Sequence, residues 1–157
     1  MIPDGGSRNG VSEETFNLKE VSPGIKRAGR HLQLNGADVF NFALREVPSS
    51  IKALYKFSER EIDQTDFFVF HQANKLINES IRKKLGIMND RKFPYSISKF
   101  GNTSSASIPL TLIDNFFDFD FDKEKEFCLC GFGVGLSWAS CIFQSSDLIF
   151  LPLIELE

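Results

Sequence analysis

The chain of 157 residues is 42% hydrophobic and 25% charged, the balance of an ordinary globular domain with a core of its own. Its net charge of −3 offers neither the basic surface of a nucleic-acid-binding protein nor the polybasic patch of a membrane-surface protein. No apolar run reaches the ~18 residues of a transmembrane helix, and no apolar stretch at the start marks a signal peptide. We therefore expect a cytoplasmic protein that binds neither nucleic acid nor membrane.

Phenylalanine is unusually frequent, with 17 residues. A bulky core is the simpler explanation. Alternatively, some of these rings cover a partner domain or line an acyl channel, above all Phe116, Phe117, Phe119 and Phe121.

The three cysteines argue against a disulfide framework because their number is odd and they cluster near one end of the chain. Cys128 and Cys130 would share one face of a strand, with a spacing too tight for an ordinary pair of metal ligands. We expect small core residues in a reducing compartment and no metal site.

Residues 1–35 are polar and rich in Gly and Pro without periodicity, which predicts a loop-rich linking segment. Apolar residues then recur at steps of three and four, the pattern of one helix face; they are Phe40, Leu44, Val47, Ile51, Leu54 and Tyr55. Pro48 lies inside this pattern and should kink or split the helix.

Residues 66–70 form a short continuous apolar run, which predicts a strand buried on both faces of a parallel or mixed sheet. Helical spacing resumes from Ala73, includes Leu76, and stops at Gly86, which suits a left-handed cap. His71 is thus expected at the carboxyl end of a strand, where the chain turns into a helix.

A second extended piece is predicted at residues 94–98. A helix from about Ser105 to Phe116 should follow, capped by Ser104 or Ser105. Pro109 falls in its first turn, where the backbone amides are free in any case.

Two strands, 127–131 and 136–143, are joined by a glycine-rich loop at residues 131–135 and should pair antiparallel. The order of elements predicts an α/β fold: layered helices on a mixed sheet that ends in an antiparallel hairpin.

His71 is the first candidate for chemistry, because the carboxyl ends of strands are where open α/β sheets hold their ligands. Phe68 and Phe70 would lower the local dielectric and disfavour the imidazolium. A neutral imidazole can donate a hydrogen bond to a developing oxyanion; the alternative is a structural core histidine. The other histidine, His31, is expected at the surface.

Asn102 is the second candidate, either a fixed amide donor beside a helix N-terminus or an ordinary turn residue after Gly101. The loop at residues 131–135 has neither the spacing of a nucleotide-binding fingerprint nor the following helix of a nucleophile elbow. Its backbone N–H groups could still approach a ligand and cradle an oxyanion.

Three motifs together resemble the ketoacyl-[acyl-carrier-protein] synthase III family. They are His71-Gln72-Ala73-Asn74 after an apolar strand, the sequence GNTSSAS at residues 101–107, and FGVGLSW at residues 132–138. Residues 34–43 and 5–8 also resemble the start of that family's C-terminal half and the loop that precedes it.

The resemblance implies a thiolase fold of two similar α/β halves. Residues 36–145 would be the C-terminal half, after a linking segment at 1–35 and before an extension at 146–157. It implies catalytic roles for His71 and Asn102, with the nucleophilic cysteine on the N-terminal half.

The resemblance also implies substrate-binding roles. Asn74 would meet the pantetheine arm, and Phe132, Gly133, Val134 and Gly135 would border the acyl thioester, with the backbone N–H near Val134 on its oxyanion. The substrates would be acyl-coenzyme A and malonyl-acyl-carrier-protein, in fatty acid or related biosynthesis, with no covalently bound cofactor. The partners would be acyl carrier protein, coenzyme A thioesters, the N-terminal half and a second copy in a homodimer.

Two departures from the family pattern matter. None of the three cysteines stands where the family has its nucleophile, so the isolated chain should be inactive. Leu76 stands about where the family has a basic residue for the carrier protein, with Lys75 as the only nearby substitute.

Two alternatives stay open: a synthase III-like acyltransferase of secondary metabolism with another acceptor, and a non-catalytic half-fold that binds or scaffolds. Related families fit less well. Plant-type polyketide synthases lack the Gln-Ala-Asn that follows His71, elongating ketoacyl synthases have a second His in place of Asn102, and hydroxymethylglutaryl synthases use a Glu as acid and base.

Overall fold

The computed structural model describes residues 2–33 and 35–154, so Leu34 and the last three residues of the expected extension lie outside it. The chain divides into two compact units between Val39 and Phe40. No helix within the described part of the chain is long and apolar enough to cross a membrane.

The first unit contains a small antiparallel hairpin that the sequence analysis missed. A single 3-10 turn, η1 (Glu13–Phe16), precedes strands β1 (Lys19–Ser22) and β2 (Ile25–Arg27), and Gly24 adopts a φ of +76° in the turn between them. Every residue of both strands is exposed. With neither face buried, the sequence has no alternation of apolar and polar residues to reveal the strands.

The second unit is built on a three-stranded mixed sheet in the order β3-β4-β5. Strand β3 (Phe67–Phe70) runs parallel to β4 (Lys125–Gly133), which pairs antiparallel with β5 (Ser137–Ser145). The expected mixed sheet and hairpin are therefore confirmed, with both hairpin strands longer than predicted.

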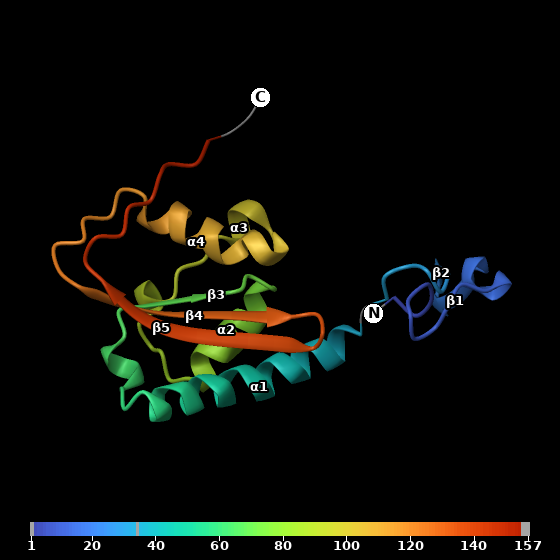
Figure 1. Cartoon of the computed structure of the whole chain (residues 1–157), viewed down its shortest axis with the longest axis horizontal. Helices are drawn as coiled ribbons and strands as arrows, with labels where there is room; N and C mark the ends of the chain where they lie inside the picture. Colours follow the sequence, from blue (N-terminus) through green and yellow to red (C-terminus); the bar gives the residue numbers. More distant parts are fainter. Residues whose placement is uncertain (1, 34, 155–157) are drawn as a thin grey trace. The chain divides into compact units, whose positions relative to one another are not determined.

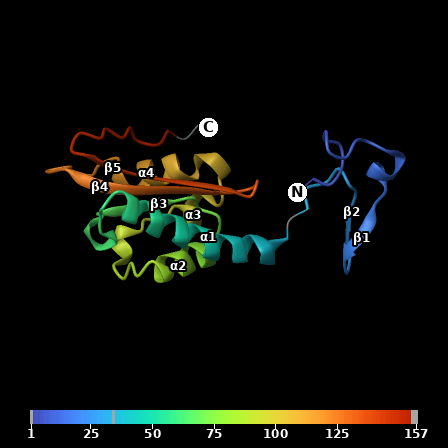
Figure 2. The same ribbon diagram turned by 60° about the horizontal axis from the view of Figure 1, so that its bottom comes forward.

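Helices cover both faces of this sheet (Figures 1 and 2). Helices α1 (Gly36–Phe57) and α2 (Lys75–Lys84) pack on one face, and α4 (Ser107–Phe116) packs on the other. Short turns make the connections: η2 (Ile62–Gln64), η3 (Asp90–Lys92), α3 (Ile97–Phe100) and η4 (Ser104–Ala106).

The core has one hydrophobic cluster on each face of the sheet. Phe68, Phe70, Cys128 and Cys130 are buried against α1 and α2. The two cysteines thus share one face, as predicted, and are small core residues.

The α4 face explains much of the phenylalanine content. Phe116 is buried there with its ring centroid 4.6 Å from that of Phe67, and Phe121 packs against the same cluster. Phe117 and Phe119 remain 50% and 38% exposed, so the core accounts for only part of the run.

Residues after β5 fold back on the α4 face. Leu148 and Phe150 pack against the cluster, and the Phe150 ring centroid lies 6.2 Å from those of Phe116 and Phe121.

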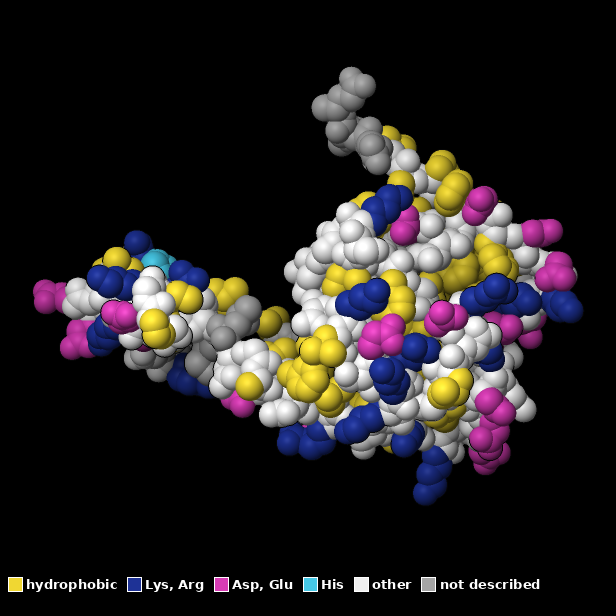
Figure 3. Space-filling model, turned by 180° about the vertical axis from the view of Figure 1, so that it is seen from behind, with side chains coloured by type: hydrophobic (Ala, Val, Ile, Leu, Met, Phe, Trp, Pro, Cys, Tyr) yellow, Lys and Arg dark blue, Asp and Glu magenta, His cyan; other side chains and the backbone are white. Residues whose placement is uncertain are grey.

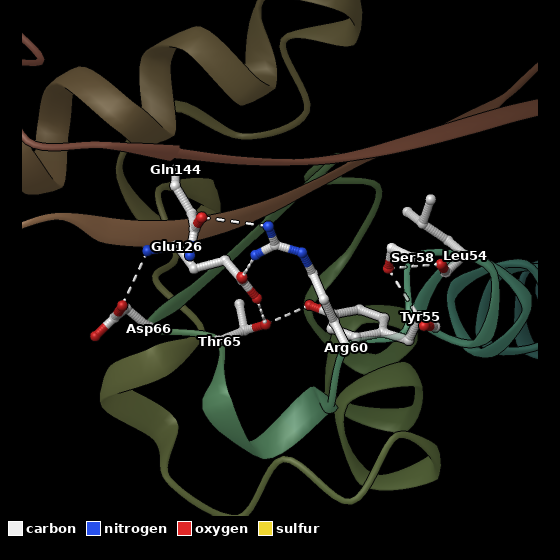
Figure 4. Close-up of polar contacts among 8 residues, drawn as sticks. All are labelled: Leu54, Tyr55, Ser58, Arg60, Thr65, Asp66, Glu126 and Gln144. Atoms are coloured by element: carbon white, nitrogen blue, oxygen red, sulfur yellow. Dashed lines mark hydrogen bonds and ion pairs between the residues drawn. The ribbon is translucent and has the colours of Figure 1, made fainter.

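A buried carboxylate ties the two hairpin strands to the elements before β3 (Figure 4). Glu126 is only 7% exposed; it is paired with Arg60 and accepts a hydrogen bond from the Thr65 hydroxyl at 2.6 Å. Tyr55 lies 2.5 Å from the same hydroxyl, and Arg60 also donates to Gln144 at 3.2 Å. The ion pair and these hydrogen bonds offset the desolvation penalty of the buried charge.

Pro48 does not split α1, which runs through it. Proline lacks the N–H that would bond to the carbonyl four residues earlier, on Leu44. Lys84 of α2 donates to that carbonyl at 3.0 Å. A side chain from the neighbouring helix therefore replaces the missing backbone bond.

The predicted extended piece at residues 94–98 is wrong, because Ile97–Phe100 form the helical turn α3. The Ser96 backbone N–H donates to the side chain of Gln72 at 3.4 Å, so it is not available to a neighbouring strand.

The predicted serine caps are also wrong. The residue before α4 is Ala106, and no side chain caps the helix. Ser104 begins the turn η4 with a φ of +53°, so it does not adopt the extended backbone of a capping residue.

Candidate active site

His71 follows β3 directly and remains attached to the sheet. Its backbone N–H donates to the Cys130 carbonyl at 2.8 Å. The backbone carbonyl of His71 accepts a hydrogen bond from the side-chain amide of Asn78, on α2, at 3.1 Å. The ring nitrogen Nδ1 lies 2.7 Å from the hydroxyl of Ser107, the first residue of α4. The imidazole is thus held where β3, β4 and α4 meet.

Burial lowers the pKa of His71 below its ordinary value, while a hydrogen bond with the Ser104 backbone acts in the opposite direction. This direction favours the neutral imidazole expected from the sequence. The aromatic ring in contact is neither Phe68 nor Phe70 but a third member of the same hydrophobic cluster. The Phe132 ring stands edge-on to the imidazole, with centroids 5.3 Å apart.

Asn102 comes from a separate loop and reaches the segment after His71. Its Nδ2 group donates to the Ala73 carbonyl at 3.4 Å, and its Oδ1 accepts the Ser104 N–H at 2.9 Å. Gly101 before it has a φ of +69°, a conformation that glycine adopts easily. The side chain is exposed, so its amide can exchange this long contact for a ligand.

Asn74 caps α2, with its Oδ1 accepting the Ile77 N–H at 3.0 Å. This structural role was not predicted from the sequence. The residue is exposed, and its Nδ2 group makes no hydrogen bond within residues 2–33 and 35–154. The cap and a contact with a substrate are therefore compatible.

The glycine-rich segment lies at the tip of the β4–β5 hairpin. Phe132 and Gly133 end β4, and Val134 and Gly135 form the turn. Val134 is 78% exposed. The contact between Phe132 and His71 places the end of β4 beside the imidazole.

Three residues that matter here were not singled out from the sequence. Ser107 is buried and contacts the imidazole, and Gln72 is buried next to His71 in the chain. Asn78 donates a hydrogen bond to the backbone carbonyl of His71. A polar residue at a core position of α2 is the signal that could have revealed Asn78. Leu76, which falls in the helical spacing of the sequence, is 65% exposed.

His31 also differs from expectation. It lies in the first unit, is half-buried rather than at the surface, and its Nδ1 accepts the Ala28 backbone N–H at 3.2 Å.

A cavity of about 720 Å³ lies elsewhere in the second unit, bordered by Tyr55, Phe68, Ile87 and Lys92 among others. None of the candidate residues borders this cavity, so it is separate from the candidate active site. Among the described residues, no group of three or more His, Cys, Asp or Glu side chains could hold a metal ion.

Comparisons with known proteins agree on one family. Residues 56–145 match the family described as 3-oxoacyl-[acyl-carrier-protein (ACP)] synthase III C terminal. The beta-ketoacyl-[acyl-carrier-protein] synthase III of Lactococcus lactis subsp. cremoris strain MG1363 is 33% identical over 92% of this chain and 45% of its own length. That of Streptococcus agalactiae strain NEM316 is 34% identical over 88% of this chain and 43% of its own length.

Solved structures give the same result. A crystal structure of a 3-oxoacyl-(acyl-carrier-protein) synthase III superposes with a TM-score of 0.82 and 34% identity, over 90% of this chain and 42% of that one. The 3-oxoacyl-(acyl-carrier protein) synthase of Burkholderia xenovorans LB400 superposes with a TM-score of 0.73 and 33% identity, over 80% and 36%. The chain spans somewhat less than half the length of these relatives. It has the thiolase-type α/β fold that its motifs implied, and it belongs to the 3-oxoacyl-[acyl-carrier-protein] synthase III family, of which it represents the C-terminal part.

Proposed function

We propose that this chain supplies the decarboxylation donors of a condensing enzyme. In the complete protein, a cysteine outside this chain would hold an acyl group, and a malonyl thioester would be decarboxylated beside it. The observation that carries the proposal is the half-buried imidazole of His71 at the end of β3, with the amide of Asn102 in contact with the same segment.

The chemistry needs two neutral donors. When the malonyl thioester loses carbon dioxide, the electrons of the broken C–C bond pass to the α-carbon and the thioester oxygen. The ring N–H of His71 and the amide of Asn102 would stabilise that oxygen by about 2–4 kcal/mol each, as other oxyanion donors do. The carbanion then attacks the acyl thioester, the cysteine thiolate leaves, and a 3-oxoacyl thioester forms.

The surrounding residues support the binding of a thioester. The free amide of Asn74 would donate to the pantetheine arm. The hairpin tip from Phe132 to Gly135 would border the acyl thioester. A backbone N–H near Val134, which is exposed, would donate a hydrogen bond to the oxyanion of that thioester. No covalently bound cofactor is required.

Acyl carrier protein, coenzyme A thioesters and an N-terminal half are the proposed partners. Leu76 and Lys75 are both exposed on the first turn of α2. The carrier protein would therefore meet Lys75 in place of a basic residue at position 76.

A hybrid protein tests the proposal. The N-terminal half of the Lactococcus lactis relative is joined to residues 2–157, and release of carbon dioxide and formation of 3-oxoacyl product are measured with acetyl and malonyl thioesters. The chain alone should give no product, and the folded hybrid should give product. His71→Ala and Asn102→Ala should each lower the rate about 100-fold or more, while His31→Ala serves as the matched control.

Two results would contradict the proposal. One is a folded hybrid that binds malonyl thioester but does not decarboxylate it. The other is an active hybrid whose rate is unchanged by His71→Ala.

A further inference from the structure

Ser107 is in contact with the imidazole from a buried position. It is 1% exposed, and its hydroxyl oxygen lies 2.7 Å from His71 Nδ1 and 3.3 Å from the backbone nitrogen of Gln72. A backbone N–H can only donate, so one lone pair of the Ser107 oxygen accepts the Gln72 N–H.

The hydrogen bonds still available to this hydroxyl determine which ring nitrogen of His71 carries the proton. If Nδ1 carried the imidazole proton, the Ser107 oxygen would accept twice and its own proton would need another acceptor. Within the described part of the chain, the Ser107 hydroxyl has no other partner. A buried donor left without an acceptor is destabilising, because it has lost its hydrogen bond to water and gained none in return. The opposite arrangement, in which the hydroxyl donates to an unprotonated Nδ1, satisfies both the Ser107 hydroxyl and the Gln72 N–H.

We infer that Ser107 fixes neutral His71 as the tautomer protonated on Nε2. The proton is then bound to Nε2, the ring nitrogen that does not contact Ser107. Ser107 is accordingly a positioning residue, which acts on the thioester only through His71. Its importance for catalysis rests on the proposed function, whereas the tautomer itself does not.

A buried network holds Ser107 in place. The Thr111 hydroxyl donates to the Ser107 carbonyl at 2.7 Å, so the Ser96 hydroxyl, 2.6 Å away, must donate to Thr111. The Ser96 backbone N–H in turn donates to the side chain of Gln72. Ser96, Thr111 and Gln72 are each at most 2% exposed. Polar networks of this kind are rigid when every member is satisfied.

The backbone of His71 is fixed as well, by the Cys130 carbonyl on one side and the Asn78 amide on the other. With backbone and Nδ1 both held, rotation of the ring is the movement that loss of Ser107 would allow. Ser107→Ala would also leave the Gln72 N–H without its acceptor.

Nitrogen NMR of the ring measures the tautomer directly. The chain is labelled with ¹⁵N-histidine, and His31→Gln assigns the His71 signals by difference. At a pH above the ring pKa, the parent chain and the exposed control Ser105→Ala should show His71 protonated on Nε2 alone. Ser107→Ala should show a mixture in which the Nδ1-protonated form, undetectable in the parent, becomes measurable, and the ring should titrate at a higher pH. Ser107→Thr, which keeps the hydroxyl, should restore the parent pattern.

Protonation of Nδ1 in the parent chain would overturn the inference, and this measurement needs no variant to fold. An unchanged tautomer in a folded Ser107→Ala variant would overturn it as well. Because neither measurement requires turnover, an inactive hybrid with the expected tautomer would count against the proposed function alone.

Discussion

At the scale of single residues, burial decides which groups can react. Burial raises the pKa of the Cys128 and Cys130 thiols to about 12, so the thiolate is scarce near neutral pH. Cys141, by contrast, is exposed on β5. Cys128 and Cys130 thus lack both the accessible sulfur and the depressed pKa that a nucleophilic cysteine requires.

This difference predicts selective alkylation. At neutral pH iodoacetamide should label Cys141 first, and Cys128 and Cys130 should react at least about 100-fold more slowly until the chain is unfolded, because both access and thiolate are lacking. Mass spectrometry of peptides after timed labelling measures the three rates. Cys141→Ser is the matched control and should leave a folded chain almost unlabelled. Rapid labelling of Cys128 in the folded chain would contradict the burial seen here.

The sequence was sufficient to place His71 but not to show what holds it. An apolar run followed by His and a helical pattern locates the residue at a strand end from local periodicity alone. The contact with Ser107 joins residues that are 36 positions apart, so it depends on how α4 packs against β3. Asn102 is an intermediate case: its motif marked it, but its contact with Ala73 is a product of the fold.

At the scale of elements, two of the errors of prediction arose where side chains took over bonds that the backbone normally makes. Ser96 bonds to Gln72 in place of a strand neighbour, and Lys84 bonds to Leu44 in place of residue 48. Local rules for strands and prolines describe backbone partners, so they do not anticipate such substitutions. The buried strand β3 and the hairpin were predictable because their bonds follow the ordinary pattern.

The bond between Lys84 and Leu44 predicts a coupling with Pro48. Lys84→Ala should destabilise the chain by about 0.5–1 kcal/mol, the low end for a hydrogen bond, because water can partly replace the ammonium at this exposed site. In a Pro48→Ala background the helix regains its own N–H, so the same substitution should cost almost nothing. Urea unfolding of the single and double variants measures the coupling.

Lys83→Ala is the matched control, since Lys83 is an exposed neighbour on the same helix. It should cost little in either background. Equal losses from Lys84→Ala with and without Pro48 would show that the lysine does not compensate for the proline.

At the scale of the whole chain, β5 is the least protected element of the sheet. Among the described strands it pairs only with β4, so its outer edge has unpaired backbone groups along nine residues. The strand has no charged residue and no proline, the devices that usually prevent edge pairing. On the face seen in Figure 3, by contrast with β5, basic and acidic side chains are interspersed with the hydrophobic ones.

This unprotected edge predicts that the chain associates with a second copy. Two β5 strands can pair antiparallel around a two-fold axis and satisfy each other's backbone groups. Sedimentation velocity at micromolar concentration should show a dimer. Ala139→Lys places a charge on an exposed residue within this strand, so that a pair of β5 strands would contain two added like charges, and should shift the chain toward monomer. Ser98→Lys adds the same charge at an exposed site away from the sheet and should leave the dimer intact.

A monomeric parent chain would refute the prediction. A dimer that withstands Ala139→Lys would show that association uses another surface, such as Phe117 and Phe119 beside α4.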